Sequence, residues 1–192
     1  VPAGFSGWRG DGIAGRGRSA ASAATACAAA GFQGICGAGD VAVCHAACGN
    51  AGGKAVDVDK KLSYQEFMKR SENYDILPFL VYDTFSATAE QEKFRAVYLM
   101  ETVIEKKKLA ELFNVMMIKV FPESDQTCRD VTRMFYGGKR IKYFNERNVL
   151  NIERLVVAFQ TEMQERDPKN YRRNIEELAG GYGIACKGGC IQ

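Results

Sequence analysis

Apolar residues recur every three or four positions along much of the chain beyond Leu62, which is the spacing that puts them on one face of a helix. The helices that this pattern predicts cover residues 64–72, 89–107, 109–121, 124–136, 146–166 and 168–178. The second and third are read either as one bent helix or as two. The strongest apolar stripe is Val149, Ile152, Leu155, Val156, Phe159 and Met163.

Local signals for helix starts support this pattern. Ser63-Tyr-Gln-Glu66 and Thr88-Ala-Glu-Gln91 are capping boxes, in which two side chains satisfy backbone groups at a helix N-terminus. No long run alternates apolar and polar residues, so no sheet is expected. The predicted fold class is therefore all-α: a small helical bundle with an extended Gly/Ala-rich N-terminal arm and a short Gly/Cys tail.

Composition divides the chain into three parts: an arm over 1–56, the bundle over 57–182 and a tail over 183–192. The arm holds thirteen glycines and sixteen alanines, too little apolar bulk to offset the entropy of ordering it. We therefore expect the arm to order on partner proteins, with a disordered leader remnant as the alternative. Its predicted partner-binding residues are Phe5, Trp8, Arg9, Arg16 and Arg18.

Charge and hydropathy argue against nucleic acid as a partner and against a membrane-spanning helix. The formal net charge is only +3 and no extended basic patch stands out, so nucleic-acid binding is not expected. The longest apolar stretch, 115–121, is broken by Lys119 and falls far short of the ~20 residues that span a bilayer. We expect no membrane span, while peripheral association stays open.

The residue types that usually carry catalysis are scarce. His45 is the only histidine, and it lies in the Gly/Ala arm without a rigid surrounding shell. The chain is therefore predicted not to be an enzyme. A thiol redox enzyme using Cys44 or Cys186 stays open, and it requires a thiol with a depressed pKa.

The seven cysteines are unevenly placed. Cys128 lies alone in the predicted bundle and is read as a small buried hydrophobe. The six predicted to form disulfides or stay as thiols are Cys27, Cys36, Cys44, Cys48, Cys186 and Cys190. A four-thiolate zinc site and covalent attachment of a tetrapyrrole are the other readings of these cysteines. No cofactor is assigned with certainty.

The segment 57–67 resembles the second half of an EF-hand calcium loop. Aligned on Glu66 as the bidentate ligand, the predicted calcium ligands are Asp57, Asp59, Ser63 and Glu66. Two positions depart from the family pattern, because Ala55 replaces its first aspartate and Lys60 its turn glycine. The resemblance implies a degenerate EF-hand calcium-binding or regulatory module.

Residues 62–74 are similar to a helix of phycobilisome rod-linker domains. This resemblance implies a home in a photosynthetic antenna complex of a plastid, or more broadly in an organelle. Together with the arm, it predicts a non-catalytic accessory or linker subunit of a larger multiprotein complex, stabilising the assembly through the arm. The partners expected are other protein subunits, and the EF-hand module is the alternative function.

Overall fold

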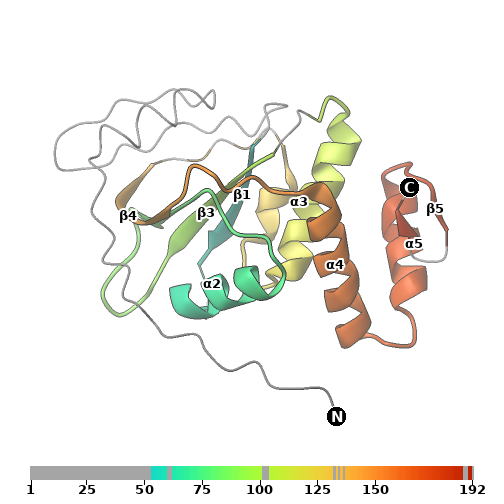
Figure 1. The fold of residues 1–192 in the computed structure, drawn as a ribbon, viewed down its shortest axis with the longest axis horizontal. Coiled ribbons are helices and arrows are strands. Elements are labelled where there is room, and N and C mark those ends of the chain that lie inside the picture. The colour runs from blue at the N-terminus through green and yellow to red at the C-terminus, as the bar shows by residue number, and fades with distance from the viewer. Residues whose placement is uncertain are drawn as a thin grey trace, which may run out of the picture.

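The computed structural model of the 192-residue chain describes residues 53–59, 62–100, 104–131, 133, 135, 137–187 and 190–191 (Figure 1). In chain order its elements are β1 (Gly53–Val58), α2 (Tyr64–Asn73), β2 (Leu80–Thr84), β3 (Phe94–Leu99), α3 (Lys107–Val120), the 3-10 turn η1 (Gln126–Arg129), β4 (Gly138–Phe144), α4 (Ile152–Arg166), α5 (Tyr171–Gly181), β5 (Cys186–Lys187) and β6 (Cys190–Ile191). β1 begins inside the segment that composition assigns to the arm.

The prediction of an all-α helical bundle is wrong, because the centre of the molecule is a four-stranded sheet. The strands lie in the order β1-β3-β2-β4, and every neighbouring pair is antiparallel. β1 and β2 are joined through α2 but are not neighbours, since β3 lies between them. β5 and β6 form a separate small hairpin. The chain is therefore an α/β protein.

The predicted helix over 89–107 is also wrong, because its centre forms β3. Phe94, Ala96 and Tyr98 face one side of the sheet while Arg95 and Val97 face the other, and all five are buried. A strand buried on both faces loses the polar–apolar alternation that identifies a strand in a sequence. The capping box before it forms a turn instead: the Gln91 N–H donates to Thr88 Oγ1, and the Thr88 N–H to the Gln91 carbonyl.

Four of the predicted helices are confirmed, as α2, α3, α4 and α5. The Ser63–Glu66 capping box opens α2 with both of its reciprocal hydrogen bonds. The predicted helix over 124–136 is wrong: its described residues contain only the single turn η1, capped by Asp125. Its apolar residues Cys128, Val131 and Phe135 are nevertheless buried, so the apolar pattern reported burial but not helical structure.

The helices form a layer against one face of the sheet, which we call the first face. Figure 1 shows α3, α4 and α5 side by side, with α2 crossing near the strands. The first-face core joins strand residues such as Val56, Val81 and Tyr98 to Phe67 of α2 and Leu112 of α3. Leu155 and Phe159 of α4 and Ile175 of α5 extend this core away from the sheet. The helix layer therefore occupies the first face.

The connection from α3 to β4 runs round the outer edge of β1. Val58 and Ser124 form an isolated antiparallel bridge, and the Asp125 N–H donates to the Asp57 carbonyl over 2.8 Å. The chain then reaches Gly138, at the opposite edge of the sheet. A Cβ at Gly138 would lie 2.0 Å from the Asp83 carbonyl oxygen, so only glycine allows β4 this close to β2.

Candidate functional site

The other face of the sheet, the second face, carries a separate apolar cluster. The cluster, called the second-face cluster, consists of Phe79, Leu80, Tyr82 and Val97, with Leu99, Ile141 and Phe144 partly buried around it. The strand register brings these residues together: Leu80 pairs with Val97 on one side and with Phe144 on the other. The cluster therefore lies across β3, β2 and β4.

No residue of a described helix belongs to the second-face cluster; its members come from the three strands and from Phe79, just before β2. Its four central side chains are nevertheless at most 3% exposed. A flat sheet face needs a covering layer to exclude water. Neighbouring residues in the sheet cover only the flanks of each side chain and leave its outer end accessible. The burial of this face is therefore not supplied by any of the described helices.

The opposite end of the second face is covered within the described chain. Phe135, on the connection to β4, lies over the guanidinium of Arg95, with 4.6 Å from Arg95 Cζ to the ring centroid. Phe135 belongs to a different small cluster, together with Ile118 and Cys128. The connection therefore covers the end of the sheet near Arg95, and Phe135 is not a member of the second-face cluster.

A buried ion pair lies under this connection. Arg95 donates through Nη2 to Asp57 Oδ2 over 2.5 Å and through Nη1 to the Tyr82 hydroxyl over 3.2 Å. Asp57 Oδ1 is buried without a hydrogen-bond partner among the described residues. Burial raises the pKa of the Asp57 carboxyl, and the Arg95 charge opposes that rise. This arrangement holds β1, β3 and β2 together by charge.

The thiol of Cys128, which lies near Asp57, is unreactive at neutral pH. Cys128 is buried, and burial raises the pKa of its thiol to about 11. At neutral pH the group is therefore protonated, and the protonated thiol is a poor nucleophile. Cys128 is a packing residue of the small cluster, as its isolated position in the sequence indicates.

A pocket opens beside the second-face cluster. It has a volume of about 330 Å³ and is lined by Phe144, Asn145, Glu146 and Arg147, where β4 ends. The Phe144 ring meets the Phe79 ring edge-on at 5.2 Å between centroids. The pocket thus continues the apolar surface of the cluster into a hollow with polar sides, a shape that suits one inserted side chain.

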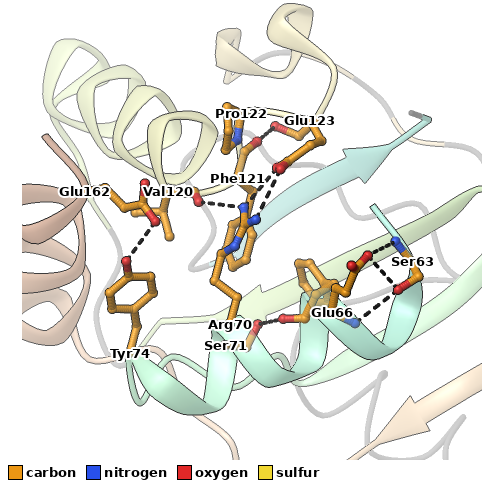
Figure 2. Close-up of polar contacts among 12 residues, drawn as sticks. Ser63, Glu66, Arg70, Ser71, Tyr74, Val120, Phe121, Pro122, Glu123 and Glu162 are labelled. Atoms are coloured by element: carbon orange, nitrogen blue, oxygen red, sulfur yellow. Dashed lines mark hydrogen bonds and ion pairs between the residues drawn. The ribbon is translucent and has the colours of Figure 1, made fainter. Parts of the chain in front are cut away.

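Side-chain contacts join α2 to the other helices on the first face (Figure 2). Arg70 makes two hydrogen bonds to the Glu123 carboxylate, of 2.9 and 3.1 Å, and a third to the Val120 carbonyl. Tyr74 donates to Glu162 of α4 over 2.7 Å. Burial, together with the Glu162 carboxylate, raises the pKa of the Tyr74 hydroxyl. These contacts hold α2 against the ends of α3 and α4.

Replacing Arg70 with methionine is expected to lower the free energy of unfolding by about 1 to 2 kcal/mol, because a bidentate, partly buried pair contributes more than an exposed one. The matched control is Arg154→Met. Arg154 pairs with Asp75 over 3.3 Å, but these side chains are 59% and 66% exposed, so a change within about 0.5 kcal/mol is expected. Urea unfolding of both variants measures the difference, and equal losses would contradict this reading of Arg70.

A second pocket lies between α2 and α4, with a volume of about 440 Å³. Its lining includes Glu66, Arg70, Tyr74 and Glu162, whose polar groups already bond to one another or to Ser63 and Glu123. A ligand would have to break these contacts. The pocket is therefore the groove between α2 and α4 and not a ligand site. The second face is the stronger candidate.

The structure does not bring the four predicted calcium ligands together. Asp57 is in β1 and pairs with Arg95, whereas Glu66 binds back to the Ser63 hydroxyl and N–H within its own capping box, which lowers the pKa of Glu66. Asp59 directly follows β1, and its carbonyl accepts a hydrogen bond from the Gln91 side chain. Among the residues that the structure describes, no group of three or more His, Cys, Asp or Glu could hold a metal ion.

Most other predicted site residues lie outside the described part of the chain. These are Phe5, Trp8, Arg9, Arg16, Arg18, Cys27, Cys36, Cys44 and Cys48. Cys186 is partly buried beside the first-face core, in the hairpin where Lys187 pairs with Cys190. Neither Cys128 nor Cys186 is in a disulfide. No helix of the described ranges is long and apolar enough to cross a bilayer.

Sequence reasoning missed the second-face cluster because it assigned no strands. A weak signal was present: Leu80, Tyr82 and Thr84 share a face, as do Val97 and Leu99, each at a spacing of two. Comparison with known proteins adds no relative, since no family model, curated protein or solved structure matches the chain. The fold and the second face define the class: a two-layer α/β protein with an apolar sheet face that none of its described helices covers.

Proposed function

We propose that this chain is a non-catalytic accessory or linker subunit of a larger protein assembly, held there by the second face of its sheet and by its N-terminal arm. The observation that carries the proposal is the second-face cluster, an apolar surface on three strands to which no described helix contributes a residue. Apolar side chains on a sheet face are covered by protein, because exposing them to water is costly.

The proposal differs from the sequence-based expectation in one respect. A sheet face, and not the side of a helical bundle, is the rigid part that docks. Phe144 and the pocket beside it supply an aromatic site with a polar rim, the composition that recurs at the centre of protein interfaces. A plastid antenna assembly remains the proposed home, and it rests on the rod-linker resemblance of residues 62–74, the segment that forms α2.

The test is whether the chain co-sediments with a large complex in extracts of the cells that produce it. We expect a tagged chain to sediment well ahead of a 192-residue monomer in a density gradient. Leu99→Asp, on the rim of the second-face cluster, is expected to shift most of the tag to the monomer position. Val157→Asp is the matched control, because Val157 lies on α4 and is 58% exposed.

Two results would oppose the proposal. A wild-type chain that sediments as a free monomer under mild extraction would remove the assembly role. Equal behaviour of Leu99→Asp and Val157→Asp within a large particle would remove the second face as the docking surface. Circular dichroism of both purified variants checks that each is folded before the gradients are compared.

A further inference from the structure

β4 is the outer strand of the sheet on the side away from β1 (Figure 1). It pairs with β2 on one side, and among the residues that the structure describes no strand pairs with it on the other. An edge strand presents backbone N–H and C=O groups on its outer side, and these can pair with an added strand. The edge of β4 is therefore a place where one more strand can extend the sheet.

The side chains of β4 are less buried than those of the strand beside it. Residues 80–82 of β2 are at most 3% exposed. Their cross-strand partners on β4 are only partly buried: Ile141 and Phe144 on the second face, and Tyr143 on the first. A side chain inside a sheet is flanked from both neighbouring strands, whereas one on the outermost strand is flanked from one side. An added strand would therefore bury these three side chains further.

β4 carries three cations and no acidic residue. Lys142 is used within the molecule, because its amine lies 2.6 Å from the Glu92 carboxylate. Arg140 pairs with Asp83, yet its side chain is 72% exposed. Lys139 is exposed as well, and it donates to a backbone carbonyl of the β2–β3 connection over 3.1 Å. Lys139 and Arg140 therefore leave positive charge accessible at the outer edge.

The charged and apolar side chains of β4 lie on different faces. Arg140 and Lys142 both approach Asp83, whose cross-strand partner Phe94 belongs to the first-face core. Ile141 and Phe144 belong to the rim of the second-face cluster. Successive side chains of a strand point to opposite faces. A segment that matches β4 therefore alternates acidic residues, toward the cations, with apolar residues on the other face.

The same charges select against a second copy of this chain. Two β4 strands side by side would bring Lys139 and Arg140 near the same cations, whereas an acidic strand gains ion pairs with them. Two irregularities in the register between β4 and β2 shorten the regular part of the edge. The matching segment therefore pairs over only a few residues, and its binding is sensitive to salt.

We propose that the edge of β4 binds an extended acidic segment of a partner protein, which adds to the sheet as a further antiparallel strand. Backbone hydrogen bonds hold the segment along β4, its acidic side chains pair with Lys139 and Arg140, and its apolar side chains lie beside Ile141 and Phe144. This contact goes beyond the proposed function, because it lies at the edge of the sheet and does not require docking of the second face.

Calorimetry on the purified full chain tests the contact, with a synthetic peptide of alternating glutamate and valine, about eight residues long, as the probe. We expect saturable binding that is at least tenfold weaker for two control peptides. One has lysine in place of glutamate, and the other keeps the glutamates but has methylated backbone amides. Methylation removes main-chain donors and keeps the charge. Equal binding of the methylated peptide, or no binding of the parent peptide, would overturn the proposal.

Charge reversal on β4 gives a second test. Lys139→Glu combined with Arg140→Glu is expected to weaken peptide binding at least tenfold. Lys106→Glu combined with Lys108→Glu is the matched control, because it changes the net charge equally at exposed positions at the start of α3. The control is expected to bind within twofold of wild type. Equal losses in the two double variants would contradict a site on β4.

Hydrogen exchange on the wild-type chain needs no variant and locates the bound peptide. We expect backbone amides of β4 to exchange at least fivefold more slowly with the peptide present, because an added strand accepts hydrogen bonds from the outward N–H groups. Amides of α5, far from this edge, serve as the internal control. Unchanged exchange in β4 under saturating peptide would refute strand addition.

The outcomes separate this contact from the assembly role. Leu99→Asp, the variant of the second face, is expected to leave peptide binding unchanged, because Leu99 lies on β3. If the peptide adds to β4 but the wild-type chain sediments as a free monomer, the edge contact is correct and the assembly role is wrong. Binding to vesicles of anionic phospholipid through Lys139 and Arg140, without binding of the peptide, would assign these cations to a lipid surface and overturn the proposal.

Discussion

Replacing Phe67 with alanine is expected to lower the free energy of unfolding by about 3 to 5 kcal/mol. Phe67 is fully buried, and its ring lies 5.2 Å from the Phe94 ring and 4.7 Å from the Phe121 ring, between centroids. These three residues come from α2, β3 and the end of α3. Removing the central ring therefore leaves a cavity at the point where the helix layer meets the sheet.

Phe85→Ala is the matched control for Phe67→Ala. Phe85 follows β2 and is 57% exposed, so its removal is expected to change stability by less than about 0.5 kcal/mol. Urea unfolding followed by circular dichroism measures both variants. A loss below about 1 kcal/mol for Phe67→Ala would mean that the packing of α2 on the sheet is not as described.

Replacing Arg95 with methionine is the second large effect, with an expected loss of about 3 to 5 kcal/mol at pH 8. Methionine keeps much of the length of the side chain but leaves the Asp57 carboxylate buried without its cation. Asp57 is buried on the second face and bonded to Arg95, whose guanidinium lies against the Phe135 ring, so water cannot easily replace the lost partner. The double variant Asp57→Leu with Arg95→Met is expected to recover most of the loss, because it removes both charges.

The loss in Arg95→Met depends on pH. Burial holds the pKa of Asp57 above its ordinary value of 3.8 in the folded chain, so protonation of Asp57 favours folding. Its contribution is full below about 3.8 and is lost as the pH rises through the folded pKa. Removing Arg95 raises that pKa further, because Arg95 opposes the effect of burial. The variant should therefore be less impaired at pH 4 than at pH 8, relative to wild type, and the reverse order would refute this assignment.

The sequence revealed the helices better than the sheet, and β3 shows why. Phe94, Val97 and Tyr98 are spaced as on one face of a helix, yet in the strand Val97 faces away from the other two. Both faces of β3 are buried, so polarity carries no period of two. Arg95 adds to the error, because a charged residue in a sequence indicates the surface, whereas this one is buried with Asp57.

The two capping boxes show what local signals can and cannot determine. The box at Ser63 opens α2, whose residues Phe67 and Ser71 are buried one turn apart. The box at Thr88 makes its side-chain bond to the Gln91 N–H but opens no helix, because the residues after it pair with β1 and β2. A cap alone cannot offset the cost of starting a helix; packing of the following residues decides.

The candidate site was beyond reach of the sequence for a related reason. The second-face cluster combines Phe79 and Leu80 with Val97 and Phe144, which are up to 65 positions apart, and only the strand register brings them together. The predicted calcium ligands around Asp57 show the opposite relation between sequence and space. Residues 57–66 are close in sequence, but the strand directs Asp57 to Arg95 while the helix cap holds Glu66 at Ser63.

The bridge between Val58 and Ser124 has a consequence for how copies of this protein avoid one another. Edge strands with free backbone groups recruit strands from other molecules, which leads to aggregation. At the end of β1 that edge is occupied by the chain itself, leaving β4 as the outer strand on the other side. There Lys139 and Arg140 are exposed, so two molecules meeting edge to edge along β4 would bring like charges together and repel.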